Sequence, residues 1–541
     1  MFKIETGRPP TLAARGLVTS PHALASAAGV DVLRAGGSAV DAAIATSAVL
    51  SVVYPHMTGI GGDAFWLIHD ARSRRTRYLA GGGRAARSAG IDWFGSRGLK
   101  EIPLRGVLPA TLTVPGSVRS WCAAHREYGR VPLARSLADA LAYAREGFPV
   151  SGRLASWIDY ARGEGFLNDD ARALFLRGGE APRPGARLSN PGLARVLERI
   201  AGEGENGFYG GETALALAAF ARAHGGFFDE GDFRAQDAPW GEPLRGSYRG
   251  VEILETPPPT QGFTVLEMLN LVEPHDVARM DPLGPDLVHL LVQAKQIAYH
   301  DRDHLLADPE HHPVPTDRLV SKAYAGRRAE LMDPKRALAW DRIPSYGTLA
   351  GDTVFLAAAD AQGNAVALVH SLYSTFGSGV VAGDTGIVLQ NRSAYFSLDP
   401  QHPNRLEAGK RPMHTLIASM ALREGRPSHV VGCMGADGQP QIHLQTYVAL
   451  IDQGRDIQAA LEAPRWLSGR FLLGEPRDLL NMEGRFPEAT LRELERRGHT
   501  VNRWPAWNEI AGHAHGITLD PLAGTLAGGS DPRSDGAAIG Y

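Results

Sequence analysis

The sequence feature that most limits the fold is a pair of apolar segments in the middle of the chain, joined by a short turn. Residues 354–359 (VFLAAA) and 365–370 (AVALVH) flank the turn residues DAQGN at 360–364. Two short apolar runs joined by a turn that contains Gly and Asn predict a β-hairpin. A Gly-Asp-Thr step precedes the first run, so Thr353 is predicted to begin the first strand.

Thr353 has the chemistry of a nucleophile if the peptide bond before it is cut. A Thr hydroxyl needs a base to remove its proton. An N-terminal Thr carries this base itself, because a free α-amino group has a pKa of about 7.7–8.0, close to the pH at which general-base catalysis works best. Attack of the Thr353 hydroxyl on the carbonyl of Asp352 would produce such a residue. An ordinary turn before a strand is the alternative, and the hairpin alone leaves both interpretations open.

Six further segments, spread along the chain in a fixed order, favour the nucleophile. They are AGGSAVDAA (35–43), TGIGGD (58–63), PPPTQG (257–262), FGSG (376–379), KRP (410–412) and SDPRS (530–534). With the Gly-Asp-Thr step, they resemble the γ-glutamyltranspeptidase family of N-terminal-nucleophile hydrolases almost from end to end. The resemblance implies an α/β chain folded as a layered αββα sandwich, autocatalytic cleavage of a precursor, Thr353 as the catalytic threonine, and no cofactor or metal.

Cleavage before Thr353 divides the chain into an expected large subunit, 1–352, and small subunit, 353–541, which together form one composite unit. The polar segment 315–352 is rich in turn-forming residues, and we interpret it as the linker that ends the large subunit. Residues 22–34 and 40–53 are predicted helices, the second one buried because it is apolar on all sides. Residues 85–250 are predicted to be mainly helical, and 248–256 to form one strand. A homodimer of the processed heterodimer is also considered.

Composition excludes several functional classes. The formal charge of −3 gives no basic face of the kind that nucleic-acid binding requires. The cysteines, Cys122 and Cys433, are too few for a disulfide framework and lack metal-site spacing. The N-terminal segment lacks the apolar core of a signal peptide, and no apolar run reaches the roughly 18 residues of a membrane span. We therefore expect a soluble, cytoplasmic protein that binds neither nucleic acid nor membrane, whereas many γ-glutamyltranspeptidases are exported or membrane-anchored.

A helix predicted over 285–307 contains the segment His300-Asp-Arg-Asp-His304. Two histidines four residues apart on a helix can bind zinc. The alternative is a solvated helix face with charge pairs, and we favour it because the reaction implied by the resemblance needs no metal.

The resemblance also assigns roles around the nucleophile. Ser371 occupies the place of the hydroxyl residue that hydrogen-bonds the catalytic threonine. Gly435 and Ala436 fall on the paired glycines whose backbone N–H groups stabilise an oxyanion, a contribution of several kcal/mol to catalysis. Alanine fits at the second position only if that residue does not need a positive φ angle.

The substrate-binding positions differ from the family pattern. The family's Asn, Gln, Asp and paired serines are replaced here, in that order, by Tyr373, Arg392, Tyr395 and His414-Thr415. The site thereby loses a carboxylate that pairs with an α-amino group and gains a guanidinium. Such a group repels an ammonium and can bind a carboxylate through two parallel hydrogen bonds. A structural salt bridge is the alternative role for Arg392.

The family's carboxylate-binding Arg aligns with Ile91, while Arg84 and Arg87 lie nearby in sequence but are displaced. The pattern of replacements resembles a sub-branch of the family that includes oxamate amidohydrolase, which hydrolyses a small amide carrying a carboxylate. We therefore expect an autoprocessing amidohydrolase that works through an acyl-enzyme on a small, anionic amide. The alternatives are γ-glutamyl transfer or glutathione hydrolysis, with Arg84 or Arg87 rearranged, and an unprocessed, non-catalytic binding or scaffold protein.

Overall fold

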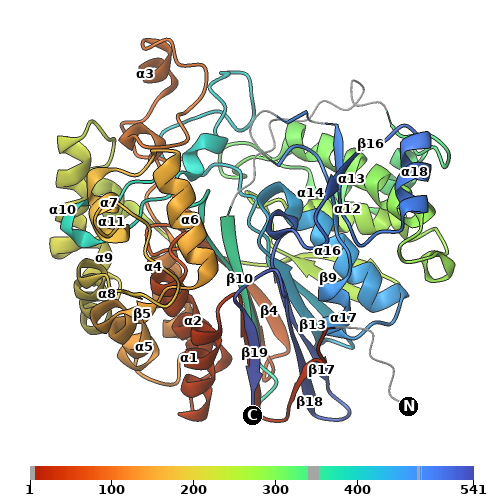
Figure 1. Cartoon of the computed structure of the whole chain (residues 1–541), viewed down its shortest axis with the longest axis horizontal. Coiled ribbons are helices and arrows are strands. Elements are labelled where there is room, and N and C mark those ends of the chain that lie inside the picture. The colour runs from red at the N-terminus through yellow and green to blue at the C-terminus, as the bar shows by residue number, and fades with distance from the viewer. Residues whose placement is uncertain (1–6, 339–351, 472–474, 477) are drawn as a thin grey trace.

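Two seven-stranded antiparallel sheets stacked face to face form the centre of the molecule (Figure 1). The computed structural model describes residues 7–338, 352–471, 475–476 and 478–541. The first sheet has the strand order β19 (Ala537–Gly540), β2 (Gly16–Ser20), β10 (Asp352–Asp360), β11 (Ala365–Tyr373), β3 (Asp63–Asp70), β4 (Arg75–Gly81) and β7 (Trp240–Gly241). The second has the order β1 (Thr11–Ala13), β18 (Thr525–Ser530), β17 (Ala514–Asp520), β13 (Arg426–Cys433), β12 (Ser419–Arg423), β9 (Val251–Glu255) and β8 (Leu244–Tyr248).

Helices cover the outer face of each sheet, on the left and right of Figure 1. The first sheet is covered by α1 (Ala23–Arg34), α2 (Ala39–Val53) and α4 (Ser117–Tyr128), with α5 (Leu133–Glu146) and α8 (Pro191–Glu203) packed outside them. The second is covered by α12 (Phe263–Val272), α16 (Gln439–Tyr447) and α17 (Ile457–Glu462), with α13 (Pro285–Leu305) packed against α12 and α16. The order of layers is therefore helix, sheet, sheet, helix, as the family resemblance implies.

The remaining elements are peripheral. They are α3 (Ile91–Gly95), α6 (Gly152–Gly163), α7 (Asp169–Phe175), α9 (Asn206–Tyr209), α10 (Gly211–Ala223), α11 (Glu230–Ala235), α14 (Thr316–Leu319), α15 (Lys322–Ala329), α18 (Glu488–Arg496), and the small sheets β5 (Phe148–Pro149) with β6 (Arg187–Leu188) and β14 (Trp466–Ser468) with β15 (Leu479–Glu483) and β16 (Thr500–Trp504). None of the helices within the described ranges is long and apolar enough to cross a membrane.

The predicted hairpin is the central pair of the first sheet, and both of its faces are buried. Along β10, Val354 and Leu356 contribute to the core under the helices, whereas Phe355 and Ala357 contribute to the core between the sheets. This alternation follows from the two-residue period of a strand. Because both faces are buried, the sequence of the hairpin is continuously apolar and does not alternate between apolar and polar residues.

Helix α2 packs on this hairpin, and all of its residues are buried, as its almost wholly apolar sequence predicts. Its first turn is fixed by a capping box in which Ser38 and Asp41 exchange hydrogen bonds between side chain and backbone. Such caps contribute about 1 kcal/mol each. The hairpin therefore rests on a helix whose start is fixed by its own sequence.

One sequence prediction needs correction. Residues 248–256 do not form one strand: the chain reverses at Arg249-Gly250, both with positive φ (52° and 77°), so β8 and β9 make a hairpin. Positive φ at both loop residues is typical of the tightest hairpin turns. The expected linker is also partly helical, because it contains α14 and α15; its residues 339–351 lie outside the described residues.

Candidate active site

Thr353 lies at the start of β10, next to Ser371 of β11. Its side chain is buried, and its Oγ1 donates a hydrogen bond of 3.1 Å to Ser371 Oγ. The pairing register shifts between Asp352 and Val354, so Thr353 sits at an irregularity of the ladder. Bulges of this kind redirect a side chain next to an active site. The structure thus brings Thr353 and Ser371 together as the sequence resemblance implies.

Ser371 Oγ accepts hydrogen bonds from several groups around the nucleophile. It accepts hydrogen bonds from the backbone N–H of Tyr373 (2.7 Å) and from Nη2 of Arg392 (3.3 Å), besides that from Thr353. Tyr373 itself has φ of 81°, in the left-handed region that aromatic residues rarely adopt. Backbone strain of this type concentrates at functional sites.

The Arg392 guanidinium is fully buried. Its Nη1 donates to Thr415 Oγ1 at 3.0 Å, and its Nε–H has no hydrogen-bond partner. Its Cζ lies 4.7 Å from the ring centre of Tyr373 and 5.7 Å from that of Tyr395. Among the described residues, no carboxylate oxygen comes within the 4.0 Å range of an ion pair. Burial accordingly lowers the pKa of Arg392.

The loop that contains Gly435 and Ala436 follows β13. Within the described chain, neither N–H group donates a hydrogen bond to another residue, as expected of groups that serve an oxyanion. Gln261 holds the loop, because its Nε2 donates both to Ala436 O (3.1 Å) and to Thr415 O (2.8 Å). Contacts therefore run without a break from Thr353 through Ser371, Arg392, Thr415 and Gln261 to Ala436.

Ala436 adopts a positive φ of 45°, although an alanine was expected to fit at this position only if φ were negative. A side chain in this region costs about 1–2 kcal/mol. The loop is held in place by a buried network in which Asp437 accepts hydrogen bonds from Arg302 and from Tyr395 Oη, the latter at 2.8 Å. We infer that these contacts offset the strain.

We expect Ala436→Gly to raise the free energy of unfolding by about 0.5–1 kcal/mol, since relief of the positive φ outweighs the greater chain entropy of unfolded glycine. The kcat should stay the same, because the N–H group remains. Guanidinium denaturation followed by fluorescence, with kinetics on the same samples, checks both parts. A midpoint at lower denaturant would contradict the assignment of strain.

The segment around Arg302 corrects another sequence prediction. Asp301, Arg302 and Asp303 are buried in α13 and do not form a solvated face. Arg302 donates to Gln261 Oε1 at 2.7 Å and to Asp303 Oδ1 at 2.8 Å, in addition to Asp437. Within the described ranges, no group of three or more His, Cys, Asp or Glu side chains is arranged to hold a metal ion.

Asp63 is a site residue that the sequence reasoning missed. It begins β3 and lies opposite Ser371 in the sheet register. Its side chain is fully buried, and burial raises its pKa to about 7 although the nearby charge of Arg392 lowers it. His414 Nε2 lies 3.7 Å from Asp63 Oδ2. Its position at the end of the TGIGGD motif is the one sequence feature that marks it.

Arg84 and Arg87 are engaged elsewhere. Arg84 pairs with Asp237 and Glu310 at 3.0 Å each, and Arg87 pairs with Asp229 and Asp232, also at 3.0 Å. Neither contacts Thr353, Ser371 or Arg392 through a described hydrogen bond. The structure therefore separates both arginines from the contacts around the nucleophile.

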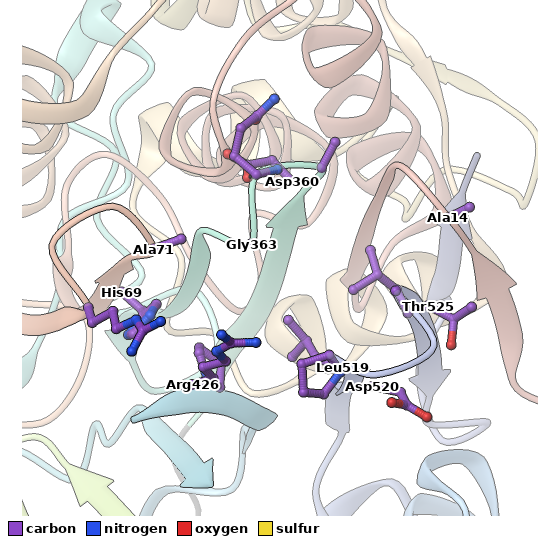
Figure 2. A pocket seen from close by; sticks show the side chains of 16 residues that line it. Ala14, His69, Ala71, Asp360, Gly363, Arg426, Leu519, Asp520 and Thr525 are labelled. Carbon is purple, nitrogen blue, oxygen red and sulfur yellow. Dashed lines mark hydrogen bonds between the residues drawn. The ribbon is translucent and has the colours of Figure 1, made fainter. Parts of the chain in front are cut away.

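A surface cavity of about 330 Å³ lies at the opposite end of the hairpin (Figure 2). The turn residues Asp360 and Gly363 line it, together with Arg426 and Asp520 from the second sheet and its loops. At about 3.3 Å per residue, the two ends of β10 are roughly 25 Å apart. This cavity is therefore distinct from the surroundings of Thr353.

Comparisons with known proteins agree with this geometry. The family model for Gamma-glutamyltranspeptidase matches residues 25–541. The glutathione hydrolase-like YwrD proenzyme of Bacillus subtilis is 40% identical over 529 residues, 97% of this chain and 98% of that protein. The oxamate amidohydrolase proenzyme of Klebsiella pneumoniae is 39% identical over 536 residues, with 97% and 98% covered.

Among solved structures, the cephalosporin acylase from Bacillus halodurans superposes with a TM-score of 0.92 at 36% identity, covering 100% of this chain and 98% of that one. The family resemblance and the layered α/β fold expected from the sequence are thereby confirmed. The relatives are named as hydrolases or acylases, and two of them as proenzymes. The chain belongs to the γ-glutamyltranspeptidase family.

Proposed function

We propose that this protein is an autoprocessing amidohydrolase with Thr353 as its N-terminal nucleophile and a small, carboxylate-bearing amide as its substrate. The observation that carries the substrate class is the buried Arg392, which has an unpartnered Nε–H and no contact with a carboxylate among the side chains that the structure describes. Leaving a buried charge without a counter-charge is costly. A substrate carboxylate beside Arg392 supplies that charge.

Processing begins in the single chain. The Thr353 hydroxyl attacks the carbonyl carbon of Asp352, and the peptide bond is replaced by an ester to the Thr353 side chain. Water then hydrolyses this ester, which releases a carboxylate on Asp352 and a free α-amino group on Thr353. The hydrogen bond between Thr353 and Ser371 supports this step, because it fixes the direction of the hydroxyl.

Substrate hydrolysis repeats the same chemistry. The α-amino group of Thr353 accepts the hydroxyl proton as Thr353 Oγ1 attacks the amide carbonyl. The N–H groups of Gly435 and Ala436 stabilise the oxyanion, and each such donor is worth about 3–4 kcal/mol. The proton passes to the nitrogen that leaves as the C–N bond breaks, and water hydrolyses the acyl-enzyme to the acid.

The oxamate amidohydrolase relative supports a substrate in which a carboxylate adjoins the amide. Arg392 contacts Ser371, which contacts Thr353, so a carboxylate at Arg392 lies close to a carbonyl at the nucleophile. A short, planar substrate fits this spacing. The rings of Tyr373 and Tyr395 lie together beside the guanidinium, with their centres 4.7 Å apart, and limit the room next to it.

Hydrolysis or transfer of γ-glutamyl groups is the second candidate. The name of the YwrD relative favours it, as does the free Oδ2 of Asp63, which is able to accept a hydrogen bond from an ammonium group. The ion pairs of Arg84 and Arg87 count against it, because neither arginine is free to hold a second carboxylate. The third candidate, a scaffold that is never cleaved, leaves the contact between Thr353 and Ser371 without a role.

A side-by-side assay separates the candidates. We expect the purified protein to hydrolyse oxamate with a kcat/KM at least about 10-fold above that for a γ-glutamyl anilide, since a hydrogen-bonded ion pair is worth about 1.5–3 kcal/mol. Ammonia release and anilide absorbance report the two reactions. Oxamide, which has the same amide without a carboxylate, is the matched control. Faster turnover of the anilide would replace our proposal by the second candidate.

The cytoplasmic location and the homodimer remain predictions. Cell fractionation and sedimentation equilibrium of the processed protein test them directly.

A further inference from the structure

The carboxyl group of Asp63 has two oxygens with different surroundings. Oδ1 accepts hydrogen bonds from the N–H groups of Gly83 (2.9 Å) and Gly116 (3.1 Å) and from Gln390 Nε2 (3.0 Å). Oδ2 is buried and accepts none. A buried carboxylate oxygen without a donor is unfavourable when charged. One oxygen therefore holds the surrounding loops, and the other is available to carry a proton.

His414 faces the free oxygen. Its Nε2 lies 3.7 Å from Asp63 Oδ2, and neither ring nitrogen has a hydrogen-bond partner. The ring is fully buried against Phe65, with ring centres 4.7 Å apart. Burial and the charges of Arg392 and Arg411 keep the pKa of His414 well below its usual value. The imidazole is therefore neutral, and its Nε2 faces Asp63 Oδ2 without forming a hydrogen bond to it.

Other titratable groups near Asp63 do not replace this pair. Arg392 acts on it electrostatically from beyond ion-pair distance, and the buried phenol of Tyr209 has its pKa raised, chiefly by burial. Tyr209 Oη donates to Pro115 O at 2.8 Å and is not among the donors to Asp63. Arg392 is thus the charged group shared between Asp63 and an anion bound at Arg392.

We propose that Asp63 controls anion binding at Arg392: a substrate carboxylate binds when Asp63 is protonated, and binding to the ionised form takes up one proton from solvent onto Asp63 Oδ2, the oxygen that faces the neutral ring of His414. This inference rests on the proposed function. Two carboxylates compete for one buried guanidinium, and protonation of Asp63 removes that competition. Asp63 acts through Arg392, so it is a positioning residue.

The sign of the pH effect follows from the pKa of Asp63, which burial raises to about 7. Below this pH, Asp63 is neutral and Arg392 is free to hold the substrate. Above it, the Asp63 carboxylate partly neutralises Arg392, and each bound anion requires a proton. The KM for oxamate is therefore expected to be constant at acidic pH and to rise about tenfold per pH unit above about 7.

Asp63→Asn tests the inference, because the amide keeps the Oδ1 acceptor and directs an N–H group toward His414. We expect its KM for oxamate to lose its pH dependence and to stay at the low acidic value up to pH 8.5. Asp384→Asn, at an exposed position, should keep the wild-type pH profile. A rise in KM with pH in Asp63→Asn equal to that in the wild type would overturn the proposal.

Calorimetry of the wild-type enzyme covers the case in which Asp63→Asn fails to fold or to be cleaved. Oxalate binding at pH 8, measured in two buffers of different ionisation enthalpy, should show uptake of nearly one proton, and uptake near zero would overturn the inference. Failure of the proposed function is a different result: the wild type would not hydrolyse oxamate at any pH. Hydrolysis of oxamate with no proton linkage removes only the role of Asp63.

Discussion

Thr353→Ala is expected to leave the protein as a single chain of 58.0 kDa without amidohydrolase activity. The methyl group cannot attack the carbonyl of Asp352, so neither the new N-terminus nor the acyl-enzyme forms. Removal of a nucleophile typically lowers kcat by about a million-fold. Denaturing electrophoresis and an ammonia-release assay measure the two effects on one preparation.

Thr353→Ser is the matched control for this experiment. It keeps the hydroxyl and the future α-amino group, so it should yield two chains, ending at Asp352 and beginning at residue 353, and retain measurable activity. N-terminal sequencing of the smaller chain identifies the cut. Turnover by an uncut wild-type protein, or cleavage of Thr353→Ala at the same bond, would disprove the nucleophile assignment.

Arg392→Gln is expected to raise the KM for oxamate by about 100-fold, the equivalent of losing one hydrogen-bonded ion pair. The kcat should fall less, because the amide of Gln is still able to donate to Ser371. Initial rates over a range of oxamate concentrations separate the two parameters. With oxamide as substrate, the variant and the wild type should behave alike, because this amide has no carboxylate.

Two further variants test whether the effect on KM is specific to the guanidinium of Arg392. Arg392→Lys keeps the charge but loses the planar, two-pronged donor, so its KM should lie between those of the wild type and Arg392→Gln. Arg87→Gln removes an exposed guanidinium, with 58% of its side chain accessible, that pairs with Asp229 and Asp232, and should leave KM unchanged. An unchanged KM in Arg392→Gln would remove the argument for an anionic substrate.

The sequence predicts the parts of this molecule that depend on local patterns. The hairpin around residues 360–364 and the buried helix α2 are encoded by runs of apolar residues with turn or capping residues at their ends. Helix α13 was likewise expected from its sequence and runs from Pro285 to Leu305. Such signals are contained within one segment, so a single sequence is sufficient to read them.

The parts that escaped prediction depend on contacts between distant segments. Asp63 belongs to the site because β3 pairs with β11, which places it opposite Ser371, more than 300 positions away. The buried state of Arg302 depends on Asp437 and Gln261, each supplied by another part of the chain. The positive φ of Ala436 is stabilised by the same packing and has no local signal. Charge patterns alone could not distinguish these residues from exposed ones.

The interleaving of the two sheets has a consequence for how such a protein can be made. Strands from before and after the Asp352–Thr353 bond occur in both sheets, and β10 is hydrogen-bonded to β2 on one side and β11 on the other. Neither fragment alone contains a complete sheet, so each would expose unpaired strand edges. Both sheets are therefore expected to form while the polypeptide is still one chain, because the covalent link keeps all of their strands together. If the two fragments are separated and unfolded after cleavage, we expect them to refold together far less efficiently than the uncut chain.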